Sequence, residues 1–149
     1  MHRAPNDLVT PFALGELAAR LGAELIGNPA QLVHRVASLD TADGDAISFL
    51  SNPRYLPSLA TSKAGCVIVS PAHRDAAALR GATLIAADPY LCFARLTQLW
   101  VARAREATTP EVHASAVVHP RAQLASHVSV GALAVIEADT VIAEGAVIG

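Results

Sequence analysis

Aromatic residues, lysine and cysteine are scarce in this sequence. Only 4% of the 149 residues are aromatic although 52% are hydrophobic, and 31 of the residues are alanine. The formal net charge is -2, from 11 basic and 13 acidic residues, and Lys63 is the one lysine. A nearly neutral chain does not bind nucleic acid through phosphate neutralisation, and an apolar chain with so little net charge is not disordered. We therefore expect a folded protein with no nucleic-acid partner.

Cysteine motifs, targeting segments and long apolar runs are also missing. Cys66 and Cys92 lie in apolar contexts without a CxxC motif, which predicts two reduced, buried thiols rather than a disulfide or a metal site. No N-terminal stretch resembles a signal peptide, and none approaches the roughly 20 apolar residues of a membrane span. We therefore expect a cytoplasmic protein.

Residues 1–104 alternate between helix and strand signals. Thr10 and Pro11 pair a capping hydroxyl with a proline at the first helical position, and the apolar spacing up to Leu21 predicts an amphipathic helix. Pro89 opens a second, longer helix. This alternation predicts a small α/β domain with some parallel pairing. Strands are predicted over five short apolar runs, at residues 23–26, 32–39, 46–50, 66–69 and 83–86.

The period changes after a polar segment, residues 105–111, that predicts a linker. From there an aliphatic residue recurs at every sixth position, and a small residue, Val or Thr follows it by four. A period of six fits neither a helix nor a strand alone, whereas it is typical of hexapeptide parallel β-helices, in which three hexapeptides complete one coil. The aliphatic positions are Val112, Val118, Leu124, Val130, Ile136, Ile142 and Ile148; the small ones are Ala116, Ala122, Val128, Ala134, Thr140 and Ala146.

The repeat makes only two coils within these residues. Solenoids need about three or more repeats to bury a core, and the pattern is still in register when it reaches Gly149. We therefore expect the N-terminal part of a longer protein. Its parts would be an α/β domain over 1–104, a linker over 105–111, and the start of a left-handed parallel β-helix over 112–149.

Three shorter stretches carry a resemblance to a known family. The most specific is residues 48–55, Ser-Phe-Leu-Ser-Asn-Pro-Arg-Tyr; the others are residues 14–18, followed by Gly22 and Gly27, and residues 36–39. With an α/β domain ahead of a hexapeptide repeat, the whole chain resembles the UDP-3-O-(3-hydroxyacyl)glucosamine N-acyltransferases (LpxD) of bacterial lipid A biosynthesis. The repeat alone would indicate only an acyltransferase superfamily or a β-helical relative.

The resemblance implies a specific activity and a specific site. Members of the family transfer a 3-hydroxyacyl chain from acyl carrier protein to the 2-amino group of UDP-3-O-acyl-glucosamine, and they act as homotrimers. Phe49 and Tyr55 would sandwich the uracil ring, and Asn52 would bond near the ribose and phosphate. The general base, a histidine, is expected beyond Gly149, so the chain alone is expected to be inactive. No cofactor and no metal are expected.

The residues themselves offer two interpretations of that site. Phe49 ends a predicted strand and Asn52 opens a short helix that includes Tyr55, so two rings can flank a slot, and stacking on a base contributes on the order of 1–3 kcal/mol. Alternatively, Phe49 is a core residue, Tyr55 packs a helix and Asn52 is only an N-cap.

Other groups in the sequence predict ordinary structural roles. The three histidines of the repeat, His113, His119 and His127, have no histidine at the equivalent position of the neighbouring coil, so we expect surface or packing residues rather than metal ligands. The acidic residues around Gly44 predict a turn rather than a calcium loop. Two other functions stay open: a non-catalytic UDP-sugar-binding or assembly module, and another hexapeptide-repeat acyltransferase.

Overall fold

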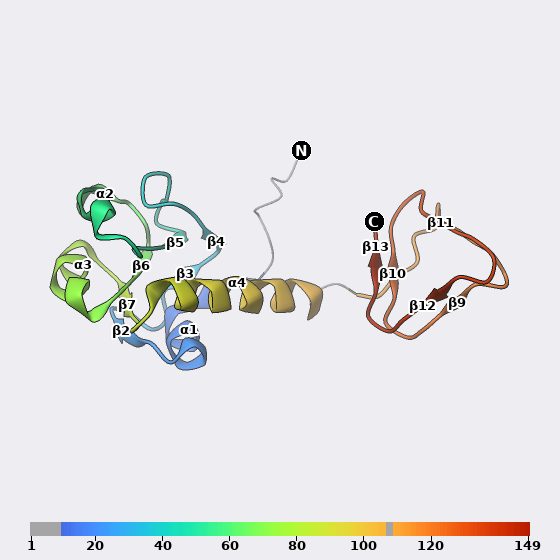
Figure 1. The fold of residues 1–149 in the computed structure, drawn as a ribbon, viewed down its shortest axis with the longest axis horizontal. Helices are drawn as coiled ribbons and strands as arrows, with labels where there is room; N and C mark the ends of the chain where they lie inside the picture. The colour runs from blue at the N-terminus through green and yellow to red at the C-terminus, as the bar shows by residue number, and fades with distance from the viewer. Residues whose placement is uncertain (1–9, 107–108) are drawn as a thin grey trace. The chain divides into compact units, whose positions relative to one another are not determined.

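The computed structural model describes residues 10–106 and 109–149 (Figure 1). Residues 1–9 and 107–108 lie outside it. The expected absence of a signal peptide at the N-terminus and the middle of the expected linker therefore fall partly or wholly outside the described residues. The chain divides into two compact units, Met1–Arg105 and Glu106–Gly149. We call them the α/β unit and the hexapeptide unit and treat each by itself.

The α/β unit is built on a five-stranded sheet. Its strands in that sheet are β2 (Glu24–Ile26), β4 (Arg35–Val36), β5 (Ala46–Phe49), β6 (Cys66–Val69) and β7 (Thr83–Ile85). Their order is β2-β7-β6-β5-β4; β4 to β7 run parallel, and β2 pairs antiparallel with β7. A separate antiparallel pair joins β1 (Phe12–Ala13) to β3 (Leu32–Val33).

Helices cover both faces of this sheet (Figure 1). The helices are α1 (Leu14–Leu21), the 3-10 turns η1 (Pro53–Tyr55) and η2 (Pro71–His73), α2 (Leu56–Thr61), α3 (Arg74–Arg80) and α4 (Pro89–Glu106). Along β6, Cys66 and Ile68 pack with α1 and α4, whereas Val67 and Val69 pack with α2 and α3. Because side chains alternate along a strand, burial on both faces explains the unbroken apolar runs. The predicted mixed α/β character is confirmed.

The helix start predicted at residues 10–11 is wrong. Helix α1 begins at Leu14, and its N-cap position makes no side-chain hydrogen bond. The amides of Leu14 and Gly15 donate instead to the carbonyls of Gln31 and Pro29, at 2.9 and 3.0 Å. A neighbouring loop therefore satisfies the first turn, and the chain before it is free to form β1. The strand predicted over 32–39 is likewise divided, into β3 and β4.

The hexapeptide unit consists of short strands, each of which pairs in parallel with the strand three hexapeptides further along the chain (Figure 1). Strand β8 pairs with β11, β9 with β12 and β10 with β13. The strands are β8 (Val117–Val118), β9 (Gln123–Leu124), β10 (Ser129–Val130), β11 (Val135–Ile136), β12 (Val141–Ile142) and β13 (Val147–Ile148).

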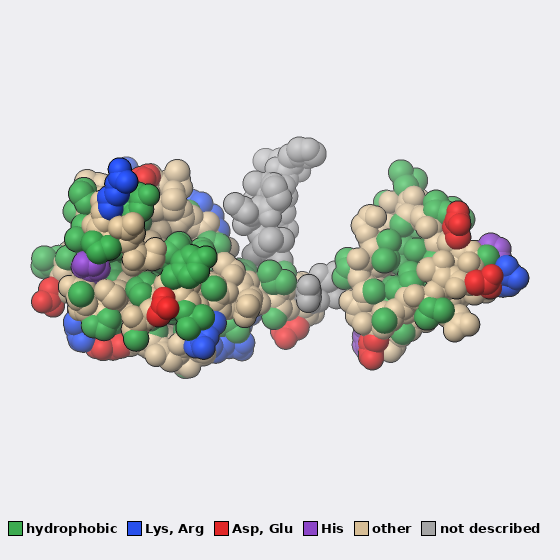
Figure 2. Space-filling view, in the orientation of Figure 1, with side chains coloured by type: hydrophobic (Ala, Val, Ile, Leu, Met, Phe, Trp, Pro, Cys, Tyr) green, Lys and Arg blue, Asp and Glu red, His purple; other side chains and the backbone are tan. Residues whose placement is uncertain are grey.

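A small apolar core fills the hexapeptide unit. It contains Val128, Val130, Ile136 and Ile142, each at most 8% exposed. Val112, the first aliphatic position of the repeat, is 46% exposed but still forms a parallel bridge with Val130. Four of the residues that precede aliphatic positions are valines that are 61–73% exposed, Val117, Val135, Val141 and Val147. Apolar side chains are visible on the surface of this unit (Figure 2).

The backbone turns at four positions spaced by six. Residues 127, 133, 139 and 145 all have positive φ angles, of 58°, 62°, 63° and 73°, and only the last of them is glycine. Non-glycine residues adopt this left-handed conformation rarely. The period of six is therefore present in the backbone conformation of the corners as well as in the side-chain pattern.

No helix within residues 10–106 or 109–149 combines the length and apolar character needed to cross a membrane.

Candidate functional site

The candidate site lies at the corner where β5 ends and η1 follows. Because β4 to β7 are parallel, their carboxyl ends share one edge of the sheet, and open α/β sheets bind ligands outside that edge. Phe49 is the last residue of β5, and the next amide, that of Leu50, still donates to the carbonyl of Ile68 at 2.8 Å. The strand ladder thus holds the backbone of Phe49 at the edge.

Asn52 caps the turn that begins after this strand. Its Oδ1 accepts a hydrogen bond from the Arg54 amide at 3.0 Å, and its carbonyl accepts one from the Tyr55 amide at 3.0 Å. The predicted N-cap is therefore confirmed. Asn52 is exposed, and capping uses its side-chain oxygen, so its Nδ2 group is left to donate to a ligand.

The rings of Phe49 and Tyr55 make no contact with each other within the described part of the chain. Tyr55 is 54% exposed at the end of η1, and Phe49 is half-buried. A base held between two rings separates them by about 7 Å, which is twice the usual contact distance between carbon atoms. The absence of direct contact therefore fits both interpretations of this corner.

Two further aromatic residues, which sequence reasoning missed, lie against Phe49. The ring of Phe93 is stacked on that of Phe49, with centroids 4.1 Å apart and an angle of 20° between planes. Tyr90, which is 65% exposed, lies with its ring centroid 6.3 Å away at an angle of 60°. Both belong to the start of α4. The sequence signal that could have placed these two residues at the sheet edge is Pro89, because it predicts a helix that starts just after a strand.

The first turn of α4 is fixed by a side-chain cap. Oδ1 of Asp88 accepts a hydrogen bond from the Leu91 amide at 3.0 Å, and its carbonyl accepts one from the Cys92 amide at 3.0 Å. Just before it, the Ala86 amide donates to the carbonyl of Val69, which continues the ladder of β6 and β7. Strand and cap together place the aromatic residues of α4 at the same sheet edge.

Positive charge at this corner comes from Arg54. Its side chain is exposed and makes no ion pair with a described carboxylate. Arg74, which follows β6, is already engaged, because its guanidinium binds both carboxylate oxygens of Glu24 at 2.9 and 2.6 Å. Arg54 is therefore a cation of this corner that an anionic ligand can reach.

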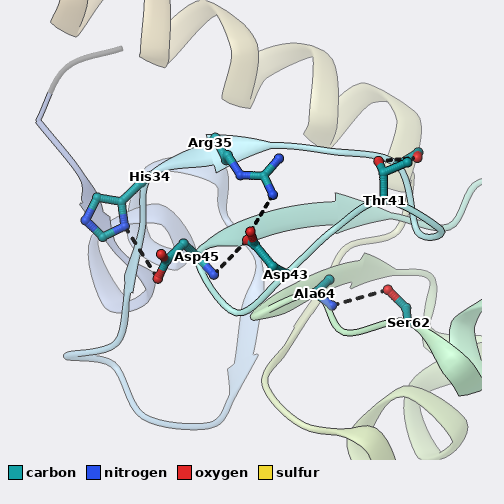
Figure 3. A network of polar contacts seen from close by, with 8 residues as sticks. His34, Arg35, Thr41, Asp43, Asp45, Ser62 and Ala64 are labelled. Carbon is teal, nitrogen blue, oxygen red and sulfur yellow. Dashed lines mark hydrogen bonds and ion pairs between the residues drawn. The ribbon is translucent and has the colours of Figure 1, made fainter. Parts of the chain in front are cut away.

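The acidic cluster lies at the opposite end of β5 (Figure 3). Asp43 and Arg35 point toward each other and form an ion pair of 2.7 Å, and Oδ1 of Asp43 accepts from the Asp45 amide at 3.2 Å. The hydrogen bond from Arg35 is the largest cause that lowers the pKa of Asp43. His34 approaches Asp45 at 4.0 Å. The predicted turn is confirmed, and its charges stabilise the loop before β5.

The two thiols are buried and free, as predicted. Burial raises the pKa of Cys66 to about 12 and also raises that of Cys92. A thiol must ionise to act as a nucleophile or a metal ligand, so neither group is suited to chemistry in this fold.

The histidines of the repeat are exposed, and two of them make hydrogen-bond contacts within its turns. Nδ1 of His113 lies 2.8 Å from Oγ of Ser115, and Nδ1 of His119 accepts from the Arg121 amide at 3.1 Å. The predicted surface or packing role is confirmed. Within the described ranges, no group of three or more His, Cys, Asp and Glu side chains could hold a metal ion.

A mostly parallel open sheet, with helices on both faces and aromatic residues at its carboxyl edge, makes this an α/β unit, here followed by hexapeptide repeats. Comparison with protein families identifies it further. The model of UDP-3-O-(3-hydroxymyristoyl) glucosamine N-acyltransferase, LpxD, matches residues 30–99, from just before β3 into α4. Over these residues the chain is similar to this family, and the resemblance noted in the sequence is confirmed.

Curated relatives agree with the family assignment. The UDP-3-O-acylglucosamine N-acyltransferase of Leptothrix cholodnii is 52% identical over 136 residues, which are 91% of this chain and 40% of the relative. That of Delftia acidovorans is 45% identical over 80% of this chain and 36% of its own length. That of Aromatoleum aromaticum is 42% identical over 92% and 39%. The chain thus spans about two fifths of the length of these relatives.

Proposed function

We propose that the α/β unit binds the uridine part of a UDP-sugar for an N-acyltransferase of lipid A biosynthesis. The reaction would move a 3-hydroxyacyl chain from acyl carrier protein to the 2-amino group of UDP-3-O-acyl-glucosamine. The observation that carries the proposal is the corner at Phe49, Asn52 and Tyr55, in a chain whose relatives are named UDP-3-O-acylglucosamine N-acyltransferases.

Each residue of the corner has a distinct role in this proposal. The uracil ring would stack between the rings of Phe49 and Tyr55, each of which keeps exposed surface. The Nδ2 group of Asn52 would donate a hydrogen bond near the ribose and phosphate. The guanidinium of Arg54 would lie close enough to the diphosphate to offset its negative charge, because no described carboxylate competes for it.

The remaining parts of the proposal concern the whole protein. The hexapeptide unit is proposed as the first two coils of a left-handed parallel β-helix, through which homotrimers form in the cytoplasm. The general base would be a histidine on coils after Gly149. His113, His119 and His127 are exposed on the corners of this unit and are not candidates. The linker is proposed over residues 105–111, of which 105–106 form the end of α4.

Titration calorimetry with UDP and UDP-N-acetylglucosamine tests the binding proposal directly. We expect the 149-residue chain to bind both ligands. Tyr55→Ala and Phe49→Ala are expected to weaken binding by about five- to 150-fold, since stacking on one base contributes about 1–3 kcal/mol. Tyr55 gives the cleaner variant, because Phe49 also packs against the core.

The matched control is Leu79→Ala, which removes a 90% exposed side chain from α3 and is expected to leave binding unchanged. If the chain binds neither ligand, the proposed site is wrong. Acyl transfer by a longer chain that includes the downstream coils then separates an enzyme from a binding module.

A further inference from the structure

We propose that Phe93 is a positioning residue for the base site. In this arrangement Phe93 supports the Phe49 ring, so that Phe93, Phe49, the base and Tyr55 form one continuous stack. The inference rests on the proposed uridine site and assigns it a residue from α4, which is distant from Phe49 in the sequence.

The geometry of the ring pair supports this role. Among the described residues, Phe49 and Phe93 form the one stacked pair, with centroids 4.1 Å apart and planes at 20°. Another close pair in this unit, Phe12 and Trp100, meets edge to face at 82°. Because the two rings are nearly parallel, the packing of Phe93 restricts the orientation of the Phe49 ring, and with it the ring face that is open to a ligand.

Support from α4 matters because Phe49 stands at the end of its strand. Without α4, a half-buried ring there would have neighbours on the sheet side only, and ordering a mobile side chain when a ligand binds lowers affinity. Phe93 covers one face of the ring, and the ring of the exposed Tyr90 lies at a tilt to it. The ring is therefore held before the ligand arrives.

The same contact decides which face of Phe49 a base can use. The face stacked on Phe93 is occupied, so a stacking ligand must take the opposite face. Helix α4 is itself firmly seated, because Leu96 is fully buried and Trp100 is 7% exposed in the main core. In the proposed site, a rigid support on one side and the half-exposed Tyr55 on the other would make a slot with one fixed wall.

A double-mutant cycle on the 149-residue chain tests this inference with UDP as the probe. Phe93→Leu keeps an apolar side chain but removes the stacking plane, and it is expected to raise the Kd for UDP about two- to tenfold. Phe93→Tyr keeps the ring and is expected to retain the wild-type Kd. In a Phe49→Leu background, Phe93→Leu is expected to have no further effect, because Phe93 acts through Phe49.

A packing control separates positioning from general loss of structure. Trp100→Leu removes a buried ring from the same helix, and it is expected to lower the melting temperature without changing the Kd for UDP. The inference is overturned if Phe49→Ala weakens UDP binding but Phe93→Leu leaves the Kd unchanged. It is also overturned if Phe93→Leu weakens binding equally in the Phe49→Leu background. Failure of the wild-type chain to bind UDP would instead refute the proposed function.

Discussion

The side chain of Phe49 lies between two environments. Its backbone belongs to the strand ladder, one face of its ring packs on Phe93, and part of it stays exposed at the sheet edge. The two interpretations made from the sequence, core residue and ligand contact, are therefore compatible. The same holds for Asn52, whose oxygen caps η1 while its nitrogen stays available.

The ion pair between Asp43 and Arg35, at the other end of β5, predicts that thermal stability depends on pH in the acid range. The folded-state pKa of Asp43 is lowered, so its ion pair with Arg35 stabilises the fold above the ordinary aspartate pKa, about 3.9, and is lost as the pH falls below it. We expect wild type to melt at a higher temperature than Asp43→Asn at neutral pH, and the difference to shrink below about pH 4. Circular dichroism melts at several pH values measure this.

Asp40→Asn is the matched control for that experiment. Asp40 lies in the same loop but makes no hydrogen bond or ion pair with described residues, so Asp40→Asn deletes no contact and is expected to melt as wild type does at neutral pH. A melting difference for Asp43→Asn that does not change with pH would show that the Arg35 contact does not act on the folded state.

The elements differ in how far the sequence predicted them. The period of six predicted the pairing of strands three hexapeptides apart, because every position of a coil carries its own sequence signal, from Val112 to Ile148. The helix start at residues 10–11 was mispredicted because the carbonyls of Gln31 and Pro29, distant in sequence, cap α1 instead. The Phe93 contact was missed for the same reason: it joins β5 to α4, and nothing local marks the pair.

The junction between the loop before β5 and the start of β6 leaves no room for a side chain. A Cβ at Gly65 would lie 2.0 Å from the carbonyl oxygen of Gly44, which is a backbone atom and cannot move aside as a flexible side chain can. Gly65→Ala is therefore expected to destabilise the fold by about 3 kcal/mol. Gly44→Ala, where a Cβ meets nothing within 4 Å, is expected to change stability by less than about 0.5 kcal/mol.

Urea denaturation of both glycine variants provides the measurement. Similar unfolding free energies for Gly65→Ala and Gly44→Ala would mean that the loop and β6 move apart more easily than their close approach implies.

Inward and outward valines of the hexapeptide unit offer a second matched pair. Val130 is 2% exposed in its core, whereas Val135 is 64% exposed on its surface. Val130→Ala is expected to cost about 2 kcal/mol, through lost burial and the cavity left behind, and Val135→Ala less than about 0.5 kcal/mol. Hydrogen exchange of the amides in residues 112–149 reports on this unit alone. Equal effects would contradict the assigned core.

At the scale of the whole molecule, each unit has an apolar core of its own. The α/β unit contains two buried clusters on either side of its sheet, and the hexapeptide unit contains a third. The residues proposed to bind uridine all lie in the α/β unit, between Phe49 and Tyr55, and Phe93 belongs to it too.

Residues 1–106, which keep α4 whole, are therefore expected to fold alone. Their melting temperature, followed by the fluorescence of Trp100, should match the α/β transition of the 149-residue chain, and so should their Kd for UDP. Loss of UDP binding on this truncation would require the hexapeptide unit to contribute to the site.

The closure of each coil after three hexapeptides has a consequence for changes in length. An inserted segment of three hexapeptides that repeats the pattern would add one more layer of strands. Every later strand would still pair with a strand three hexapeptides before it. Insertion of one hexapeptide would place each later strand beside a different hexapeptide from the one it now pairs with. A single inserted residue would turn each later aliphatic side chain away from the interior. Changes in length are therefore expected to be tolerated in steps of three hexapeptides or at the corners of this unit.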